Sequence, residues 1–359
     1  MTRRIHRLRE VMTERDLPAM LITRPQNVGY LTGFTGSTAA LVVTAAEAVF
    51  ITDARYVEQA RAECAPLPVV PTQTGHTYGE KIAEVAHGMG ITTLGLESDY
   101  LTLRDFDKLR EELEGIALRP EAELVSGLRV VKDAGEIERI RRACALVDAT
   151  FEHILTLVHP GVRERDLAIE IECFMKKRGA EREGFDTIVA SGVRAALPHG
   201  RASNKPIEAG DLVIFDFGAT LNSYSSDLTR TMVVGQASER QRDIYAIVRE
   251  AQAAAIAAIR PGVEAKQVDA TARDLIAARG YGEQFGHGLG HSLGREVHDG
   301  PGLSPRSEFK LEAGMVFTVE PGIYIQGWGG VRIEDDVVVT KHGCDVLTTS
   351  PRELLELSP

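Results

Sequence analysis

Short apolar runs alternate with helical patterns over the first 125 residues of the chain. Each run is rich in Ala, Val, Ile, Leu or Phe, as expected for buried strands. Residues 1–16 form a charged amphipathic helical pattern, and residues 53–64 predict a second helix. This alternation of strands and helices predicts an α/β domain over residues 1–125. The expected strands are 19–23, 39–43, 48–52 and 94–96.

A Gly-rich, aromatic stretch, NVGYLTGFTGS at 27–37, lies between these elements. Glycine clusters punctuate regular structure, so the stretch predicts a loop. One interpretation of this loop is a plain turn. The other is a rim that reaches a neighbouring active site.

A second domain is expected over residues 126–359. The segment LRVVK at 128–132 is typical of a connector, and a long helical pattern follows it. Asp133 precedes this pattern and Glu136 stands three residues later, which is the spacing of a capping box. The pattern continues to about residue 158, with apolar positions at Ile137, Ile140, Cys144 and Val147.

Two segments of this second domain repeat one another. HPGVRERDLAIEIECFMKKRGA at 159–180 aligns with RPGVEAKQVDATARDLIAARGY at 260–281, and Pro160 and Pro261 set the offset at 101 residues (261 − 160). Each copy begins with a Pro-Gly turn, continues as a helix and stops at a glycine. Two unrelated helices could share the turn, but the apolar positions also match. Duplication is therefore the better interpretation, and it predicts a site at the junction of two halves.

Two aspartates interrupt apolar strand patterns within this domain. Asp216 follows the run Leu212–Phe215, and Asp227 begins a second apolar run at 228–234. A buried ionised carboxylate is costly unless it is paired or holds a metal. Asn222 and Ser223 supply turn chemistry between the runs. Adjacent strands would therefore place both carboxylates on one face, where they could share a cation.

Further polar groups lie where a core should be apolar. Glu320 ends the run MVFTVE, while Glu334 and Arg332 share one face of a predicted strand over 331–339. The segment GHGLGHSLGREVHDG adds three histidines. A lone Glu is usually solvated and a lone His usually hydrogen-bonded in a core. Four carboxylates with one imidazole, however, carry a charge of about −4, which two divalent ions balance and one does not. Oxygen ligands with one imidazole favour Mn, Co, Fe or Zn.

Composition excludes several other classes of protein. The chain has 359 residues, of which 43% are hydrophobic and 26% charged, and its net charge is −11. A basic footprint for nucleic acid is missing, and no apolar run is long enough to cross a membrane. The N-terminus is not a signal peptide. The scattered cysteines predict buried thiols in a reducing compartment, so a soluble cytoplasmic protein is expected; they are Cys64, Cys144, Cys173 and Cys344.

Five motifs, in the order VIFDFGA, SDLTRT, GHGLGH, TVEPGIY and VRIEDD, resemble those of the pita-bread (M24-type) metallopeptidases. That family includes aminopeptidase P, prolidase and methionine aminopeptidase. The N-terminal half and ALPHG at 196–200 are similar to the proline-specific branch. The resemblance implies an α/β N-terminal domain and an α+β pita-bread catalytic domain with an internal pseudo-two-fold repeat. It implies metal ligands at Asp216, Asp227, His291, Glu320 and Glu334.

The same resemblance implies roles for the remaining polar residues. Two divalent ions, Mn foremost with Co or Zn as alternatives, would be bridged by Asp227 and Glu334 and would supply a hydroxide near neutral pH. Glu320 would move its proton to the leaving nitrogen. That nitrogen belongs to proline and has no N–H. The enzyme must therefore recognise the substrate by its shape and by the flanking carbonyl group. Substrate contacts are implied for His199, His287, His298 and the aromatic wall Phe185, and carboxylate orientation for Arg332.

Aminopeptidase P is the activity that the sequence favours, with prolidase as the alternative. A prolidase should offer a cation to the free carboxylate of proline, yet the segment after His298 holds no Arg until Arg306. A metal-free relative such as creatinase, or a binding protein on this fold, is disfavoured because all five ligand positions are retained. Methionine aminopeptidase usually lacks the α/β half. Proline-containing peptides are the expected substrates, and a homodimer is implied by the resemblance.

Overall fold

The computed structural model describes residues 2–73 and 75–358 and divides the chain into two compact units, Met1–Arg129 and Val130–Pro359. The sequence placed this division at 125/126. The LRVVK connector is partly helical, because its first residues complete a short helix, α6 (Ser126–Arg129). No helix in the described ranges is both long and apolar enough to span a bilayer.

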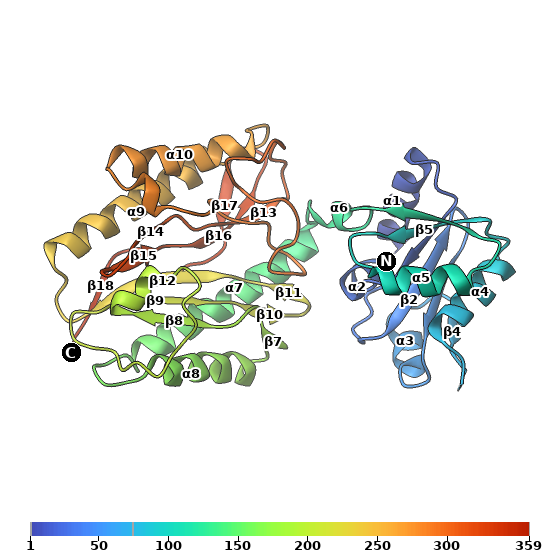
Figure 1. Cartoon of the computed structure of the whole chain (residues 1–359), viewed down its shortest axis with the longest axis horizontal. Coiled ribbons are helices and arrows are strands. Elements are labelled where there is room, and N and C mark those ends of the chain that lie inside the picture. The colour runs from blue at the N-terminus through green and yellow to red at the C-terminus, as the bar shows by residue number, and fades with distance from the viewer. Residues whose placement is uncertain (1, 74, 359) are drawn as a thin grey trace. The chain divides into compact units, whose positions relative to one another are not determined.

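The first unit is a mixed six-stranded sheet in the order β4-β3-β2-β1-β5-β6, covered by helices (Figure 1). Side chains on β2 alternate between two cores, with Leu41 and Val43 on one face and Ala40 and Val42 on the other. The α/β prediction is confirmed. Its strands are β1 Ala19–Ile22, β2 Ala39–Thr44, β3 Ala48–Thr52, β4 Val69–Pro71, β5 Thr93–Glu97 and β6 Ala117–Glu121. Its other helices are α1 Thr2–Glu14, α2 Pro25–Thr32, α3 Val57–Glu63, α4 Tyr78–Gly88 and α5 Leu103–Glu112.

The structure of this unit differs from the sequence-based predictions at residues 27–32 and at the start of the second helix, and it describes the N-terminal helix from Thr2 onward. The loop predicted over 27–37 is wrong for residues 27–32, which form most of α2: Pro25 stands at its first turn, and Gly33 closes it with φ 85°. The second predicted helix begins later than expected, at Val57. The expected N-terminal helix is present from Thr2, and Met1 lies outside the described residues.

The second unit packs helices on both sides of curved, mostly antiparallel sheets (Figure 1). The strand β9 is buried on both faces: Val213 and Phe215 join a core with α7 and α8, while Leu212 and Ile214 join a core with α9 and α10. Its helices are α7 Ala134–Leu155, α8 Glu164–Lys177, α9 Glu239–Ala258 and α10 Ala265–Ala278, with 3₁₀ turns η1 Gly192–Ala196 and η2 Gly282–Gln284. The predicted capping box at Asp133 is present at the start of α7.

The strands of the second unit form four small sheets, of which β18-β12-β9-β8 and β13-β16-β17 carry most of the site. The single strand predicted over 331–339 is instead two strands, because β15 pairs with β14 while β16 pairs with β13. The strands are β7 Arg182–Glu183, β8 Ile188–Ser191, β9 Leu212–Phe217, β10 Ala219–Leu221, β11 Tyr224–Ser225, β12 Leu228–Val234, β13 Val316–Val319, β14 Gly322–Ile325, β15 Gly329–Arg332, β16 Asp335–Val339, β17 Cys344–Val346 and β18 Leu355–Leu357.

The duplication is visible in the backbone. The helices α8 and α10 begin and end 101 residues apart (265 − 164 and 278 − 177). Gly161 and Gly262 precede them with φ 97° and 84°, a left-handed conformation that favours glycine. Both glycines also donate their N–H to a carbonyl of a later segment, that of Ile207 or Leu311. The repeat predicted from sequence is therefore a structural repeat.

The cysteine prediction is only half right. Cys64 and Cys144 are buried, but Cys173 is exposed and Cys344 is partly exposed. Cys173 lies on α8, whose buried face is occupied by residues such as Leu167 and Ile171.

Candidate metal centre

The two aspartates predicted to share a cation lie on neighbouring antiparallel strands. Asp216 of β9 pairs with Thr229 of β12, and Asp227 immediately precedes β12. Residues two apart share one face of a strand, so Asp227 lies on the same face as Thr229 and beside Asp216. This is also the face of Leu212 and Ile214. The sequence pattern therefore predicted the placement correctly.

The other three expected ligands come from the later half of the unit. Glu320 directly follows β13, Glu334 lies between β15 and β16, and His291 lies in the His-rich loop. That loop is fixed to β13, because the His291 N–H donates to Thr318 Oγ1 at 3.0 Å and the Thr318 N–H donates to the His291 carbonyl at 2.9 Å. Gly290 permits this approach, since a Cβ there would lie 2.1 Å from the Thr318 carbonyl oxygen.

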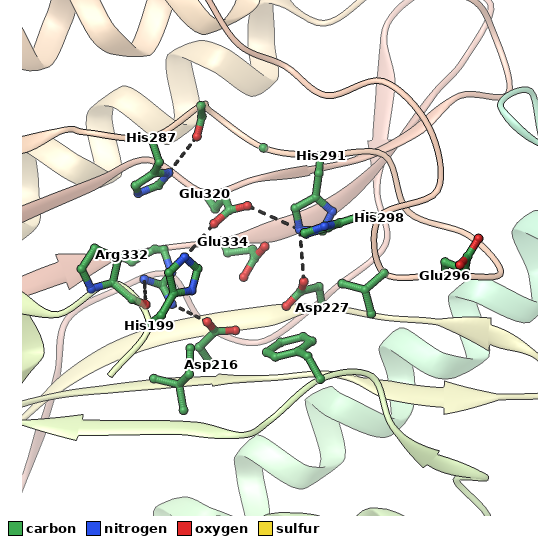
Figure 2. A pocket seen from close by; sticks show the side chains of 16 residues that line it. His199, Asp216, Asp227, His287, His291, Glu296, His298, Glu320, Arg332 and Glu334 are labelled. Carbon is green, nitrogen blue, oxygen red and sulfur yellow. Dashed lines mark hydrogen bonds and ion pairs between the residues drawn. The ribbon is translucent and has the colours of Figure 1, made fainter. Parts of the chain in front are cut away.

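All ten predicted site residues line one cavity of about 600 Å³ (Figure 2). One ligand atom from each of Asp227, His291 and Glu334 lies within 4.8 Å of the other two. His291 Nε2 also lies 3.6 Å from Glu320 Oε1. The ten are Phe185, His199, Asp216, Asp227, His287, His291, His298, Glu320, Arg332 and Glu334.

This donor set fits divalent metal ions. Asp227 Oδ1 and Glu334 Oε1 are buried and accept no hydrogen bond from the described residues. A buried carboxylate oxygen without a donor is costly, and coordination to a cation removes that cost. Carboxylates with a single imidazole match the ligand chemistry of Mn, Co or Zn.

Burial, and after it repulsion between the carboxylates, shifts the pKa values of this cluster. Burial, and then repulsion from Glu334, raises the pKa of Asp227 well above its ordinary value. Burial and the charge of Glu320 do the same to the pKa of Glu334. Burial also raises the pKa of Asp216, although Arg332 opposes that shift. Metal binding must therefore displace protons from this cluster.

Arg332, which itself lines the cavity, and Thr229 orient the carboxylates through polar contacts. The Arg332 guanidinium forms a short ion pair with Asp216 through Nη2, and its Nε donates to Thr229 Oγ1 at 3.1 Å. The Thr229 hydroxyl in turn donates to Glu334 Oε2 at 2.6 Å. Arg332 Nε also lies 4.0 Å from Glu320 Oε2. Arg332 thus contacts three of the four acidic side chains directly or through one hydroxyl.

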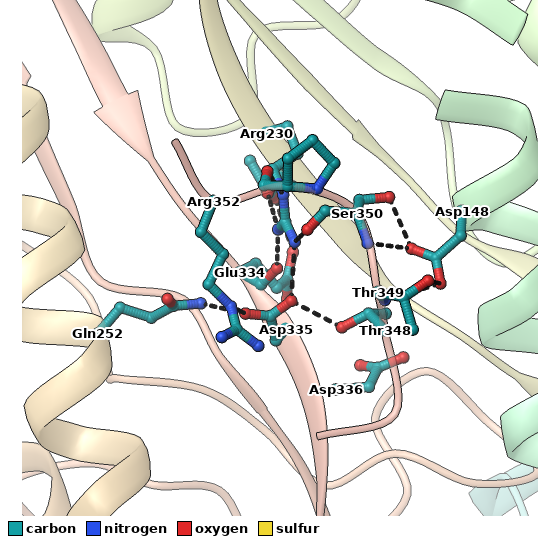
Figure 3. A network of polar contacts seen from close by, with 12 residues as sticks. Asp148, Arg230, Gln252, Glu334, Asp335, Asp336, Thr348, Thr349, Ser350 and Arg352 are labelled. Carbon is teal, nitrogen blue, oxygen red and sulfur yellow. Dashed lines mark hydrogen bonds and ion pairs between the residues drawn. The ribbon is translucent and has the colours of Figure 1, made fainter. Parts of the chain in front are cut away.

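A buried polar network fixes the backbone beside Glu334 (Figure 3). Arg230 donates to the Glu334 carbonyl through Nη1 and to Asp335 Oδ1 through Nη2, the latter at 2.8 Å. The Asp335 carboxylate also accepts from Thr348 Oγ1 and Gln252 Nε2, both at 2.7 Å. These contacts hold the junction between β15 and β16, and the side chains that make them are not among those that line the cavity.

His287 is held by hydrogen bonds inside the protein. Its Nδ1 lies 2.8 Å from the Gly288 carbonyl, to which it can only donate, so Nε2 accepts from the Tyr324 hydroxyl at 3.0 Å. Arg332 Nη1 donates to the same hydroxyl at 2.8 Å. Burial lowers the pKa of His287 and raises that of Tyr324 to about 12. A substrate can reach His287 Nε2 only in place of the Tyr324 hydroxyl.

The other substrate-facing candidates are more open. His298 packs against His291 with ring centroids 4.2 Å apart, and burial followed by the charge of His291 lowers its pKa. His199 is exposed on a loop, and Phe185 is half-buried. All three side chains line the cavity with the acidic cluster.

Two supporting residues escaped the sequence analysis. Thr229 lies two residues after Asp227 in SDLTRT, so strand alternation alone places it on the cavity face. Tyr324 closes the motif TVEPGIY, but nothing in the sequence reveals that it contacts both His287 and Arg332.

Comparison with known proteins agrees with this site. Residues 138–341 match the family described as Metallopeptidase family M24. Residues 4–131 match the family described as Creatinase/Prolidase N-terminal domain. The chain therefore belongs to metallopeptidase family M24, with the pita-bread fold in its catalytic unit.

Several relatives match along nearly the whole chain. A solved Xaa-Pro dipeptidase from Bacillus anthracis is 44% identical with a TM-score of 0.96, and the match covers 99% of each chain. The Xaa-Pro dipeptidase of Pyrococcus furiosus is 41% identical over 99% of this chain and 100% of its own length. A solved X-Pro aminopeptidase from Thermotoga maritima is 38% identical with a TM-score of 0.90, covering 96% of this chain and 99% of that one.

Proposed function

We propose that the chain is an Xaa-Pro dipeptidase, or prolidase, that uses two divalent metal ions, with aminopeptidase P as the second candidate. The carrying observation is the cluster of Asp227, His291 and Glu334, whose ligand atoms lie within 4.8 Å and include two buried oxygens without a donor. Relatives named as Xaa-Pro dipeptidases support proline-containing dipeptides as substrates. This reverses the order of the two activities expected from sequence.

The five side chains that would hold the metal ions are Asp216, Asp227, His291, Glu320 and Glu334. Four carboxylates around one cavity favour two ions over one, and we propose manganese as the metal, with cobalt or zinc as substitutes. Bound metal would supply Lewis acidity and a nucleophile near neutral pH.

The chain's own residues would bind the substrate and move the proton. Glu320 accepts a hydrogen bond from Thr318 Oγ1 at 3.1 Å on one oxygen, and we propose that it carries the proton to the proline nitrogen. His298, whose pKa is lowered by burial, would donate a hydrogen bond to the scissile carbonyl oxygen. Phe185 would pack against the proline ring. His199 would bind and orient the substrate at the open edge.

Recognition of a free proline carboxylate is what separates the two candidate activities. Among the described residues that line the cavity, the only Arg or Lys is Arg332, which is already engaged by Asp216 and Tyr324. In a dipeptidase the carboxylate would therefore meet the imidazole of His199 or His298, because His287 already donates its N–H to the Gly288 carbonyl. If imidazoles alone do not bind the free carboxylate, the groove would suit a longer peptide. The lack of an unengaged Arg or Lys among the described lining residues therefore keeps aminopeptidase P as the second candidate.

The cellular setting stays a proposal. We propose a cytoplasmic homodimer that acts on peptides and has no nucleic-acid or membrane partner. The net charge of −11 supports the absence of a nucleic-acid partner.

The test compares three substrates that differ only beyond the scissile bond. Manganese is added to chelator-stripped protein, and free alanine is measured from Ala-Pro, Ala-Pro-amide and Ala-Pro-Ala. A dipeptidase should prefer Ala-Pro over the amide by about tenfold or more, because one charge-assisted contact is lost. A preference for Ala-Pro-Ala would make aminopeptidase P the correct assignment. No release from any of them, with metal bound, would refute both.

A further inference from the structure

The loop that carries His199 is exposed but anchored at both ends. It runs from Ser191, at the end of β8, to Ser203, and includes the exposed side chains Val193 and Leu197, at 57% and 50% exposure. The His199 ring forms no hydrogen bond or ion pair with any residue that the structure describes. Its position is therefore set by the backbone of the 191–203 loop.

One buried carboxylate closes this loop. Glu164, the first residue of α8, is fully buried, and its Oε1 accepts from the Ser191 N–H at 2.8 Å and from Ser191 Oγ at 2.9 Å. Its Oε2 accepts from the Ser203 N–H at 3.0 Å and from Ser203 Oγ at 2.6 Å. Arg194 within the loop pairs with the same carboxylate at 3.0 Å. A single side chain thus joins the start, the first turn and the end of the loop.

The other half of the duplicated unit holds its histidine loop in a comparable way. Asp269 of α10 is 1% exposed and accepts from the Leu289 N–H at 3.0 Å and from Arg273. Arg273 donates to the carbonyls of Phe285 and His287 at 2.9 and 2.7 Å. With the offset of 101, Asp269 corresponds to position 168, one helical turn after Glu164 (269 − 101). Each repeat helix therefore presents a buried carboxylate to the loop of one cavity histidine.

The two histidines differ in how far they depend on these contacts. His287 has both ring nitrogens engaged, so its ring has anchors besides its loop. The His199 ring has no such contact with a described residue, so it depends on the position of its loop. A carboxylate that holds four donors from two serines forms charge-assisted bonds that are stronger than neutral ones. Loss of this contact should therefore move His199 more than loss of any one hydrogen bond at His287.

We propose that Glu164 is a positioning residue for His199, acting through the 191–203 loop and without touching the substrate. This inference rests on the proposed function, because it assigns His199 to substrate binding. Glu164→Gln keeps the volume of the side chain but removes its charge and one acceptor oxygen. Since a displacement of about 1 Å at a positioned group can cost about 10²-fold, we expect kcat/KM to fall about tenfold to a hundredfold.

A double-mutant cycle separates positioning from general stability. Glu164→Gln, His199→Ala and the double variant are compared with the native protein by kcat/KM on Ala-Pro and by metal content. In the His199→Ala background, Glu164→Gln should cost less than about twofold, whereas in a His287→Ala background it should keep its full effect. Asp166→Asn, on the same helix but in an exposed pair with Arg163, should leave activity unchanged. Equal losses in both backgrounds, or loss of metal, would overturn the proposal.

A structural readout decides the question even without activity. Amide hydrogen exchange of residues 192–202 should speed up in Glu164→Gln, while residues 285–289 stay protected. The milder variant Ser203→Ala, which removes one of the four donors, should give a smaller change of the same sign. Unchanged exchange at 192–202 would refute the role of Glu164. Absence of Ala-Pro cleavage by the native protein, with the exchange change present, would instead refute the proposed function.

Discussion

Replacing Asp227 with asparagine should stabilise the metal-free protein, although it removes a proposed metal ligand. Asp227 is 4% exposed, and a ligand atom of Glu334 lies within 4.8 Å of one of its own. Burial and this neighbour raise its pKa well above the ordinary value. The folded chain therefore binds more protons than the unfolded chain above about pH 4, so metal-free stability falls as pH rises.

The size of the effect follows from the separation of the two carboxylates. Two unit charges 4.8 Å apart repel by about 3 kcal/mol at an effective dielectric constant near 20. Partial proton uptake by the native cluster lowers this figure, so we expect a gain of about 1–3 kcal/mol at pH 7.5. For a unit of this size, that gain corresponds to a rise in Tm of about 2–10 °C.

Thermal unfolding with and without manganese measures the change in Tm caused by Asp227→Asn, which should be positive without metal and negative with it. In chelator at pH 7.5, Asp227→Asn should melt above the native protein, and the gap should close toward pH 4. With manganese the order should reverse, because only the native protein gains binding energy. Asp345→Asn, at an exposed acid of the same unit, should change neither comparison. If metal-free Asp227→Asn melts lower at pH 7.5, the carboxylates do not repel as the structure implies.

Three further substitutions test the roles of His298, Tyr324 and the α7 cap. His298→Ala should keep its metal content, measured by elemental analysis, but lose about 10²-fold in kcat; loss of metal instead would assign His298 to the ligands. Tyr324→Phe, which disconnects His287 from Arg332, should lower kcat/KM about tenfold, and an unchanged value would show that this hydroxyl is dispensable. Asp133→Ala should lower the free energy of unfolding by about 1 kcal/mol in urea titrations through loss of the α7 cap, while activity stays constant.

Much of the site was predictable because its acidic residues interrupt runs of apolar residues that are typical of buried strands. Asp216 and Asp227 stand out as acids in apolar runs, and alternation fixes the face on which they lie. The capping box of α7 and the repeat helices were equally predictable, since their signals are short in sequence.

What the sequence did not predict depends on contacts between distant segments. The single strand expected over 331–339 is broken because its two halves pair with different partners. A loop was expected over residues 27–32, but they form most of a short buried helix that begins at Pro25 and is closed by Gly33. Glu164 is an ordinary helix-start acid in sequence, and only the fold brings Ser191 and Ser203 to it.

A manganese titration of chelator-stripped protein, with bound metal and release of alanine from Ala-Pro measured together, tests the two-metal site. We expect no hydrolysis without metal and activity that saturates at two ions per chain. Hydrolysis by the stripped protein, or full activity with a single ion and no binding of a second, would contradict a two-metal site built from Asp227 and Glu334.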